Sequence, residues 1–166
     1  MSAKSSAPIA GFHSAHDHDH DHCVEDALSA AEAVCRTQGA RLTILRRRVL
    51  ELVWQSHRPV GAYTVLDQLK REHRSAAPPT VYRALDFLLE LGLVHRIQSL
   101  NAFVGCAHPD AVHRGFFLIC RDCGDAIEVE DDGVDGAIDR SAKRFGFEIQ
   151  SRTIEAAGLC PECNQA

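Results

Sequence analysis

Two pairs of cysteines constrain the fold of this chain more than any other feature of its sequence. Each pair is spaced as CxxC, with Cys120 and Cys123 in the first and Cys160 and Cys163 in the second. Four thiolates in two such pairs are the usual ligand set of a closed, tetrahedral zinc site with a structural role. The 36 residues between the pairs are too many for a compact zinc ribbon, so we expect the site to tie the end of the chain back onto a small sheet.

The number of cysteines helps to decide between metal binding and redox or disulfide chemistry for these thiols. A single CxxC would fit a thioredoxin-like redox motif, but two pairs make a metal site the better interpretation. The chain has seven cysteines, an odd number, and its first residues lack the charged and then apolar layout of a signal peptide. Metal-binding thiols therefore explain the composition better than a disulfide framework. No apolar run approaches the roughly 20 residues that span a bilayer, so we expect a cytoplasmic protein without a membrane partner.

The pattern of apolar residues predicts an α+β fold whose first half is helical. Residues 1–22 are rich in His and Asp and have almost no apolar surface to bury, so we expect them to be disordered. Helical periodicity and breaking residues predict helices at 24–38, 44–56, 62–73 and 79–91. Two strand-like segments, LVHRIQ and AFVGC, follow. Three helices followed by a hairpin are the layout of a winged helix-turn-helix, so 23–105 is interpreted as a DNA-binding domain.

The second half of the chain changes to a pattern of strands around one helix. Strands are predicted at 116–120, 126–130 and 147–156, with a helix near 133–145. Gly105 and Pro109 lie where the pattern changes, so the boundary between the domains is placed near 105–113. Residues 106–166 would then form a small α/β domain that carries both CxxC pairs.

The net charge of −5 hides a basic middle section. Residues 36–96 carry eleven Lys and Arg against five Asp and Glu, whereas the segments on either side are acidic. A block of like charge is most often a solvated surface, but a basic domain can also face the phosphates of nucleic acid. The charge alone leaves both interpretations open.

The helix that begins at Pro79 is the candidate for reading DNA. Recognition helices present their N-terminal residues to base edges in the major groove, and here those residues are Thr80, Tyr82 and Arg83. An ordinary core helix with a few surface charges would show the same periodicity, but the basic residues nearby favour the DNA interpretation. The further candidates for DNA contact are Arg41, Arg46 and Tyr63.

Three stretches of the sequence together resemble the ferric uptake regulator family, and specifically its zinc uptake regulator branch. They are RLT at 41–43 with Arg46, PPTVYRALDFLLELGLVHR at 78–96, and FFLICRDCG at 116–124 followed by the final CPEC. The resemblance covers about residues 24–163. It implies a winged-helix domain before an α/β dimerisation domain, and a metal-loaded homodimer that binds palindromic operator DNA and represses uptake genes.

The same resemblance implies a second, regulatory zinc site, so that each subunit would hold two zinc ions. Its ligands would be His95, Cys106, His113 and Glu128, a set that spacing alone would not select. A metal held by all four would clip the two domains at one angle and shift the population toward the form that fits DNA. One thiolate and one carboxylate balance the charge of Zn²⁺. The His-rich run that precedes FFLIC in iron-sensing members is missing, which favours zinc over iron.

Other functions stay open at this point. Within the same fold, the signal could be iron, manganese, nickel or peroxide. In a different class, the chain could be a zinc-buffering protein or metallochaperone that uses the His-rich tail. A zinc hydrolase is disfavoured because no HExxH or comparable pattern of ligands and base occurs, so we expect no enzymatic activity. The sequence does not predict what Cys23, Cys35 and His108 contribute.

Overall fold

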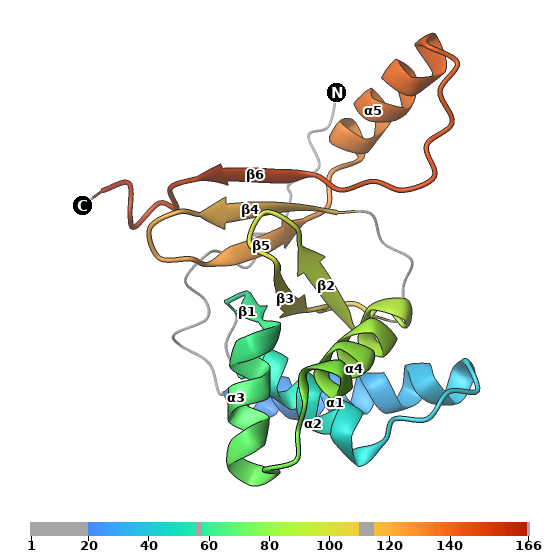
Figure 1. The fold of residues 1–166 in the computed structure, drawn as a ribbon. Helices are drawn as coiled ribbons and strands as arrows, with labels where there is room; N and C mark the ends of the chain where they lie inside the picture. Colours follow the sequence, from blue (N-terminus) through green and yellow to red (C-terminus); the bar gives the residue numbers. More distant parts are fainter. Residues whose placement is uncertain (1–19, 56–57, 110–114, 166) are drawn as a thin grey trace.

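The computed structural model describes residues 20–55, 58–109 and 115–165 (Figure 1). Residues 1–19, which include most of the predicted disordered tail, lie outside this range, as does the predicted ligand His113. The first half comprises α1 (His20–Thr37), α2 (Ile44–Trp54), β1 (Val60–Gly61), α3 (Ala62–Glu72), α4 (Pro78–Glu90), β2 (Val94–Ile97) and β3 (Ala102–Gly105). The second half comprises β4 (Phe116–Cys120), β5 (Ala126–Val129), α5 (Asp132–Arg144) and β6 (Glu155–Gly158).

Capping residues define the ends of two helices that the sequence predicts. The side-chain oxygen of Thr43 accepts a long hydrogen bond, 3.4 Å, from the backbone N–H of Arg46, which caps α2. Pro78 and Pro79 occupy the first turn of α4, where the missing N–H would have had no helical partner. Gly92 follows that helix with a φ of 67°, a conformation that favours glycine. Both helices are confirmed.

Helices α1 to α4 pack into one hydrophobic core that also includes part of the β2–β3 hairpin, which we call the wing (residues 94–105). The apolar stripe that periodicity predicts for α4 supplies four buried side chains to this core: Val81, Ala84, Leu85 and Leu88. Leu91, the fifth residue of that stripe, is only partly buried and packs against the core. No helix among the described residues combines the length and apolarity needed to cross a membrane.

Two three-stranded sheets are stacked beside the helices (Figure 1). In the first sheet β3 pairs antiparallel with both β1 and β2, so the wing is its main part. In the second sheet β4 pairs antiparallel with β5 and parallel with β6. Figure 1 shows the wing between helices α1 to α4 and the second sheet, with α5 on the other side of that sheet. The parallel pairing of β6 brings the end of the chain back beside β4, as the spacing of the CxxC pairs predicts.

One row of residues across the second sheet faces the wing. Phe117 of β4 lies opposite Glu128 of β5 and opposite Glu155 of β6. Directly opposed residues of neighbouring strands project from the same face of a sheet. The Phe117 ring lies against the ring of His95 on β2, with centroids 5.5 Å apart. The row therefore presents two carboxylates to the wing, one on each side of an aromatic ring.

The structure differs from the expected elements in three places. Helix α1 begins at His20, so residues 20–22 of the predicted tail are helical. Pro59 and Gly61 in the sequence predict a turn at 59–61, but the two residues of β1 pair there with β3. The strand predicted at 147–156 is wrong over most of its length, because β6 begins only at its ninth residue. The segment before β6 is bound to α5 instead, since Arg152 donates 2.5 Å hydrogen bonds to two aspartates of that helix.

Replacement of Gly105 tests how the wing packs against the helices. A Cβ atom at Gly105 would lie 2.2 Å from Cε2 of Trp54. Gly105→Ala should therefore displace the indole ring and lower the free energy of unfolding by about 1–3 kcal/mol. Gly158→Ala is the matched control, because a Cβ atom there meets nothing within 4 Å. Chemical denaturation measures both variants, and equal stability of the two would contradict this packing.

Candidate metal centres and nucleic-acid interface

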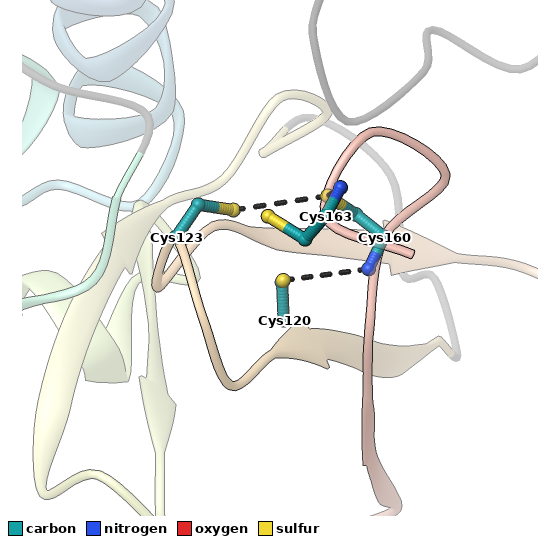
Figure 2. A group of neighbouring side chains, drawn as sticks. All are labelled: Cys120, Cys123, Cys160 and Cys163. Carbon is teal, nitrogen blue, oxygen red and sulfur yellow. Dashed lines mark hydrogen bonds between the residues drawn. The ribbon is translucent and has the colours of Figure 1, made fainter. Parts of the chain in front are cut away.

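The four cysteines of the CxxC pairs converge at one end of the second sheet (Figure 2). Cys120 ends β4, and Cys160 follows shortly after β6, the parallel neighbour of β4. The sulfurs of these two cysteines and those of Cys123 and Cys163 all lie within 4.8 Å of one another. Zn–S bonds of about 2.3 Å in a tetrahedron require sulfurs about 3.8 Å apart, and the sulfurs of Cys123 and Cys160 are 3.9 Å apart. The donor set fits a zinc ion.

Hydrogen bonds and crowding give these thiols unequal acidity. The backbone N–H of Cys160 donates to Sγ of Cys120 at 3.3 Å, and such backbone donors lower the pKa of Cys120 to about 6. Burial raises the pKa of Cys123 to about 11. Neighbouring thiols, first of all Cys160, raise the pKa of Cys163. Since the site ionises only in part without a cation, zinc binding at neutral pH must displace protons.

An ion pair joins the four-cysteine site to the helical half of the chain. Asp125 follows Cys123 by two residues and is only 7% exposed. Its Oδ1 accepts a 2.6 Å hydrogen bond from Nε of Arg58, which lies in the connection between α2 and β1. A buried carboxylate without a partner would be costly, so this contact stabilises the junction between the two halves. No sequence pattern indicated either residue.

A second cluster of possible metal ligands lies between the wing and the second sheet. It contains His95 on β2, Cys106 immediately after β3, and Glu128 on β5, with one ligand atom of each within 4.8 Å of the others. Nε2 of His95 lies 3.3 Å from Oε2 of Glu128. Bonds of about 2.0 Å from a tetrahedral zinc to nitrogen and oxygen place those two atoms about 3.3 Å apart. Three of the four predicted regulatory ligands are therefore together, and His113 lies outside the described residues.

The surroundings of this cluster orient its ligands. Cys106 is 2% exposed, and Phe117 contacts the His95 ring. A Cβ atom at Gly115 would come within 2.9 Å of the Glu128 side chain, so glycine leaves room for that carboxylate. His95 and Glu128 also line a cavity of about 610 Å³, which provides space for an ion to enter. The sequence contained no signal for Gly115, because its role depends on a neighbour from another strand.

The candidate DNA contacts lie on α2, α3 and α4 or just before α2. Tyr63 is 66% exposed and Tyr82 is 39% exposed. Arg41 and Arg83 are also exposed, whereas Thr80 is half-buried. Arg46 has contacts within the domain, since its guanidinium lies 3.5 Å from the centroid of the Phe87 ring and donates to the carbonyl of Arg41. Contact of these six residues with DNA stays a prediction.

The two arginines that follow Arg46 on α2 form ion pairs with acidic side chains of the helical half of the chain. Arg47 pairs with Glu32 and Glu51. Arg48 pairs with Glu51 and Glu72. Part of the positive charge of the middle section is thus paired inside the helical half, so Arg47 and Arg48 are less available to phosphates than unpaired arginines would be.

Comparisons with known proteins match most of the chain. The model of the ferric uptake regulator family matches residues 37–157. The zinc uptake regulation protein of Escherichia coli (strain K12) is 40% identical over 140 residues, which make up 84% of this chain and 82% of that protein.

Solved structures resemble this one over similar lengths. A zinc uptake regulator complexed with zinc and DNA gives a TM-score of 0.81 at 39% identity, covering 86% of this chain and 95% of that chain. The holo form of XcZur gives 0.76 at 47% identity, with coverages of 84% and 97%. Its apo form gives only 0.51 at 44% identity, with coverages of 85% and 97%. Because identity and coverage are nearly equal for these two forms, the lower score indicates a different arrangement of the chain.

The raised pKa values of Cys123 and Cys163 predict how zinc affinity at the four-cysteine site depends on pH. Both thiols hold protons at neutral pH and release them to the solvent on binding. Because two protons are released, the affinity should rise with pH between about pH 6 and about pH 8, by about 100-fold per unit. Competition with a chelator of known pH dependence, in the Cys106→Ser variant, isolates this site. An affinity that does not change with pH would contradict the assigned thiol chemistry.

Proposed function

The chain belongs to the ferric uptake regulator family, in its zinc uptake regulator branch, and from this we propose that it is a zinc-responsive transcriptional repressor. Its zinc-loaded homodimer binds palindromic operators of genes for zinc uptake and homeostasis. Regulators of this family are not enzymes. The observation that carries the proposal is the convergence of His95, Cys106 and Glu128, which come from both halves of the chain, within 4.8 Å.

The chemistry of this cluster supports zinc as the signal. Mixed sulfur, nitrogen and oxygen ligands in a tetrahedron suit zinc, and a thiolate makes manganese and magnesium poor fits. The charges of Cys106 and Glu128 offset that of Zn²⁺, so no net charge is buried. We place His113, in the linker between the domains, as the fourth ligand. With the four-cysteine site, each subunit then holds two zinc ions.

The location of the cluster supports a switch based on domain angle. His95 belongs to the wing, Cys106 directly follows the wing at the boundary between the domains, and Glu128 belongs to the second sheet. A bound ion therefore holds the DNA-binding domain (residues 23–105) against the dimerisation domain (residues 106–166). The resemblance to the holo rather than the apo form of a relative agrees with this closed arrangement. An ion about tenfold selective for the closed form contributes about 1.4 kcal/mol of coupling.

The DNA contact is placed on the first turns of α4. Thr80, Tyr82 and Arg83 are at the N-terminal end of that helix, which is where recognition helices meet base edges. Exposure of Tyr82 and Arg83 supports this assignment. Arg41, Arg46 and Tyr63 are assigned to backbone contacts nearby. This function places the protein in the cytoplasm with the chromosome.

The dimer contact is placed on the second half of the chain. Helix α5 has no buried residue in this structure, and Phe145 and Phe147 after it are 78% and 68% exposed. Large apolar side chains that are exposed close together in the chain support a site that a partner covers. In a homodimer the two copies of α4 must match half-sites on one face of the duplex, about 34 Å apart or a multiple of that.

Replacement of the buried thiol of the cluster tests the proposed signal. Cys106→Ser should reduce zinc-dependent DNA affinity at least about 100-fold, because serine is a poor ligand for zinc. Binding of duplexes selected from a random pool by the zinc-loaded wild type, titrated against free zinc, measures the loss. Cys23→Ser is the matched control, since Cys23 belongs to neither cluster.

Further measurements show whether a loss of DNA binding in this titration comes from the regulatory site alone. Elemental analysis and sedimentation should show that Cys106→Ser keeps its four-cysteine zinc and its dimer. Zinc-dependent DNA binding that survives in this variant would make the assigned regulatory site wrong. A wild type that responds to iron, manganese or nickel but not to zinc would overturn zinc as the signal.

A further inference from the structure

The turn of the wing is bound by a carboxylate from the second sheet. Oε1 of Glu155 accepts a 2.5 Å hydrogen bond from the backbone N–H of Gln98. Oε2 of the same side chain accepts a 3.0 Å hydrogen bond from the backbone N–H of Ser99. Both oxygens of one carboxylate thus hold two consecutive backbone donors. Hydrogen bonds to a charged group are shorter and stronger than those between neutral groups.

The hairpin itself leaves these two N–H groups available. The register of β2 and β3 ends at the pair Ile97 and Ala102, so Gln98 and Ser99 lie beyond the ladder. The turn is closed by the N–H of Asn101, which donates to the carbonyl of Gln98 at 3.2 Å. Arg96 also donates to the side chain of Asn101 at 2.7 Å. A turn held in this shape presents its first two N–H groups to an anion outside the hairpin.

Glu155 is in the same row of the second sheet as the proposed zinc ligand Glu128. Phe117 separates the two carboxylates and is the register partner of both. The wing therefore meets this row at three points, through His95 to Glu128, through His95 to Phe117, and through the turn to Glu155. The contact made by Glu155 needs no metal.

Glu155 keeps its charge in this position. Partial burial raises the pKa of Glu155, but the hydrogen bonds from Ser99 and Gln98 outweigh that effect and hold the pKa below its usual value. The side chain is therefore a carboxylate at neutral pH and can accept both N–H groups.

We propose that Glu155 is a positioning residue that latches the wing turn to the dimerisation domain and thereby sets the zinc concentration at which the protein responds. Only the effect of Glu155 on the zinc response rests on the proposed function. The latch adds to the stability of the closed arrangement before the regulatory ion binds, so a larger fraction of the protein is ready for zinc. The apparent zinc affinity rises in proportion to that fraction.

The experiment compares Glu155→Ala with Glu148→Ala in the full-length dimer. Glu148 is an exposed acid in the segment between α5 and β6, so its replacement changes the charge equally without touching the wing. Amide hydrogen exchange, with only the four-cysteine zinc bound, reports on the N–H groups of Gln98 and Ser99. We expect their exchange to become about tenfold faster in Glu155→Ala and to stay unchanged in Glu148→Ala.

The second readout is DNA binding against free zinc, with duplexes selected from a random pool by the wild type. The zinc concentration for half-maximal binding should rise about tenfold in Glu155→Ala, while saturating zinc restores full binding. Glu155→Gln, which keeps the size and one acceptor, should give an intermediate value. If Glu155→Ala loses its dimer or its four-cysteine zinc, the zinc midpoint of Glu155→Gln tests the proposal instead.

The outcomes separate the latch from the function on which it rests. Unchanged exchange at residues 98 and 99 overturns the latch, and changed exchange with an unchanged zinc midpoint overturns its role in setting the response. A wild type that shows no zinc-dependent DNA binding defeats the proposed function, while the exchange measurement still decides whether Glu155 holds the wing.

Discussion

The proposed regulatory site and the Glu155 contact both depend on the wing being buried on both faces. Side chains alternate along a strand, so Val94 and Phe103 enter the helical core while Ile97 and Val104 pack against the second sheet. The two interfaces differ greatly in size. Only a few residues make the second cluster, among them Ile119, and each buried aliphatic side chain contributes roughly 1.5–3 kcal/mol. The wing is thus firmly part of the helical half and weakly attached to the sheet, which is the condition for a domain angle that a ligand can control.

The two metal sites differ in which side of this weak junction supplies their ligands. All four cysteines of the first site belong to the second half of the chain, so an ion there completes one domain whatever the angle. His95 and Glu128 come from opposite sides of the junction, so an ion there binds best in one arrangement. A ligand shifts a conformational equilibrium only by its difference in affinity for the two states. That difference can be large for the second site and small for the first, which separates a sensing role from a structural one.

The sequence predicts what local patterns determine, and it misses what depends on distant pairing. Helices α2, α3 and α4 and the hairpin follow from periodicity and caps, and the structure confirms them. Motif spacing predicts that the four cysteines lie together, and their sulfurs are within 4.8 Å of one another. His95, Cys106 and Glu128 came from family resemblance, because no spacing rule connects residues on two strands and at the end of a third. Arg58 and Glu155 had no signal at all, since each is defined by a partner more than 50 residues away. Most of the predicted strand at 147–156 was wrong for a different reason, because hydrogen bonds from Arg152 to α5 outweigh the strand propensity of the segment.

The charges at the junction explain how the closed arrangement can exist before the regulatory ion arrives. Three carboxylates lie there, and each has a partner from the helical half or the wing: His95 for Glu128, the turn N–H groups for Glu155, and Arg58 for Asp125. Closing the domains therefore leaves none of these three buried without compensation. Zinc at the proposed regulatory site would then select a form that is already populated, with His95 and Glu128 exchanging their mutual contact for bonds to the metal. The sensitivity of such a switch depends on the fraction closed in its absence as much as on the ligands themselves, so residues that never touch the metal help to determine the response.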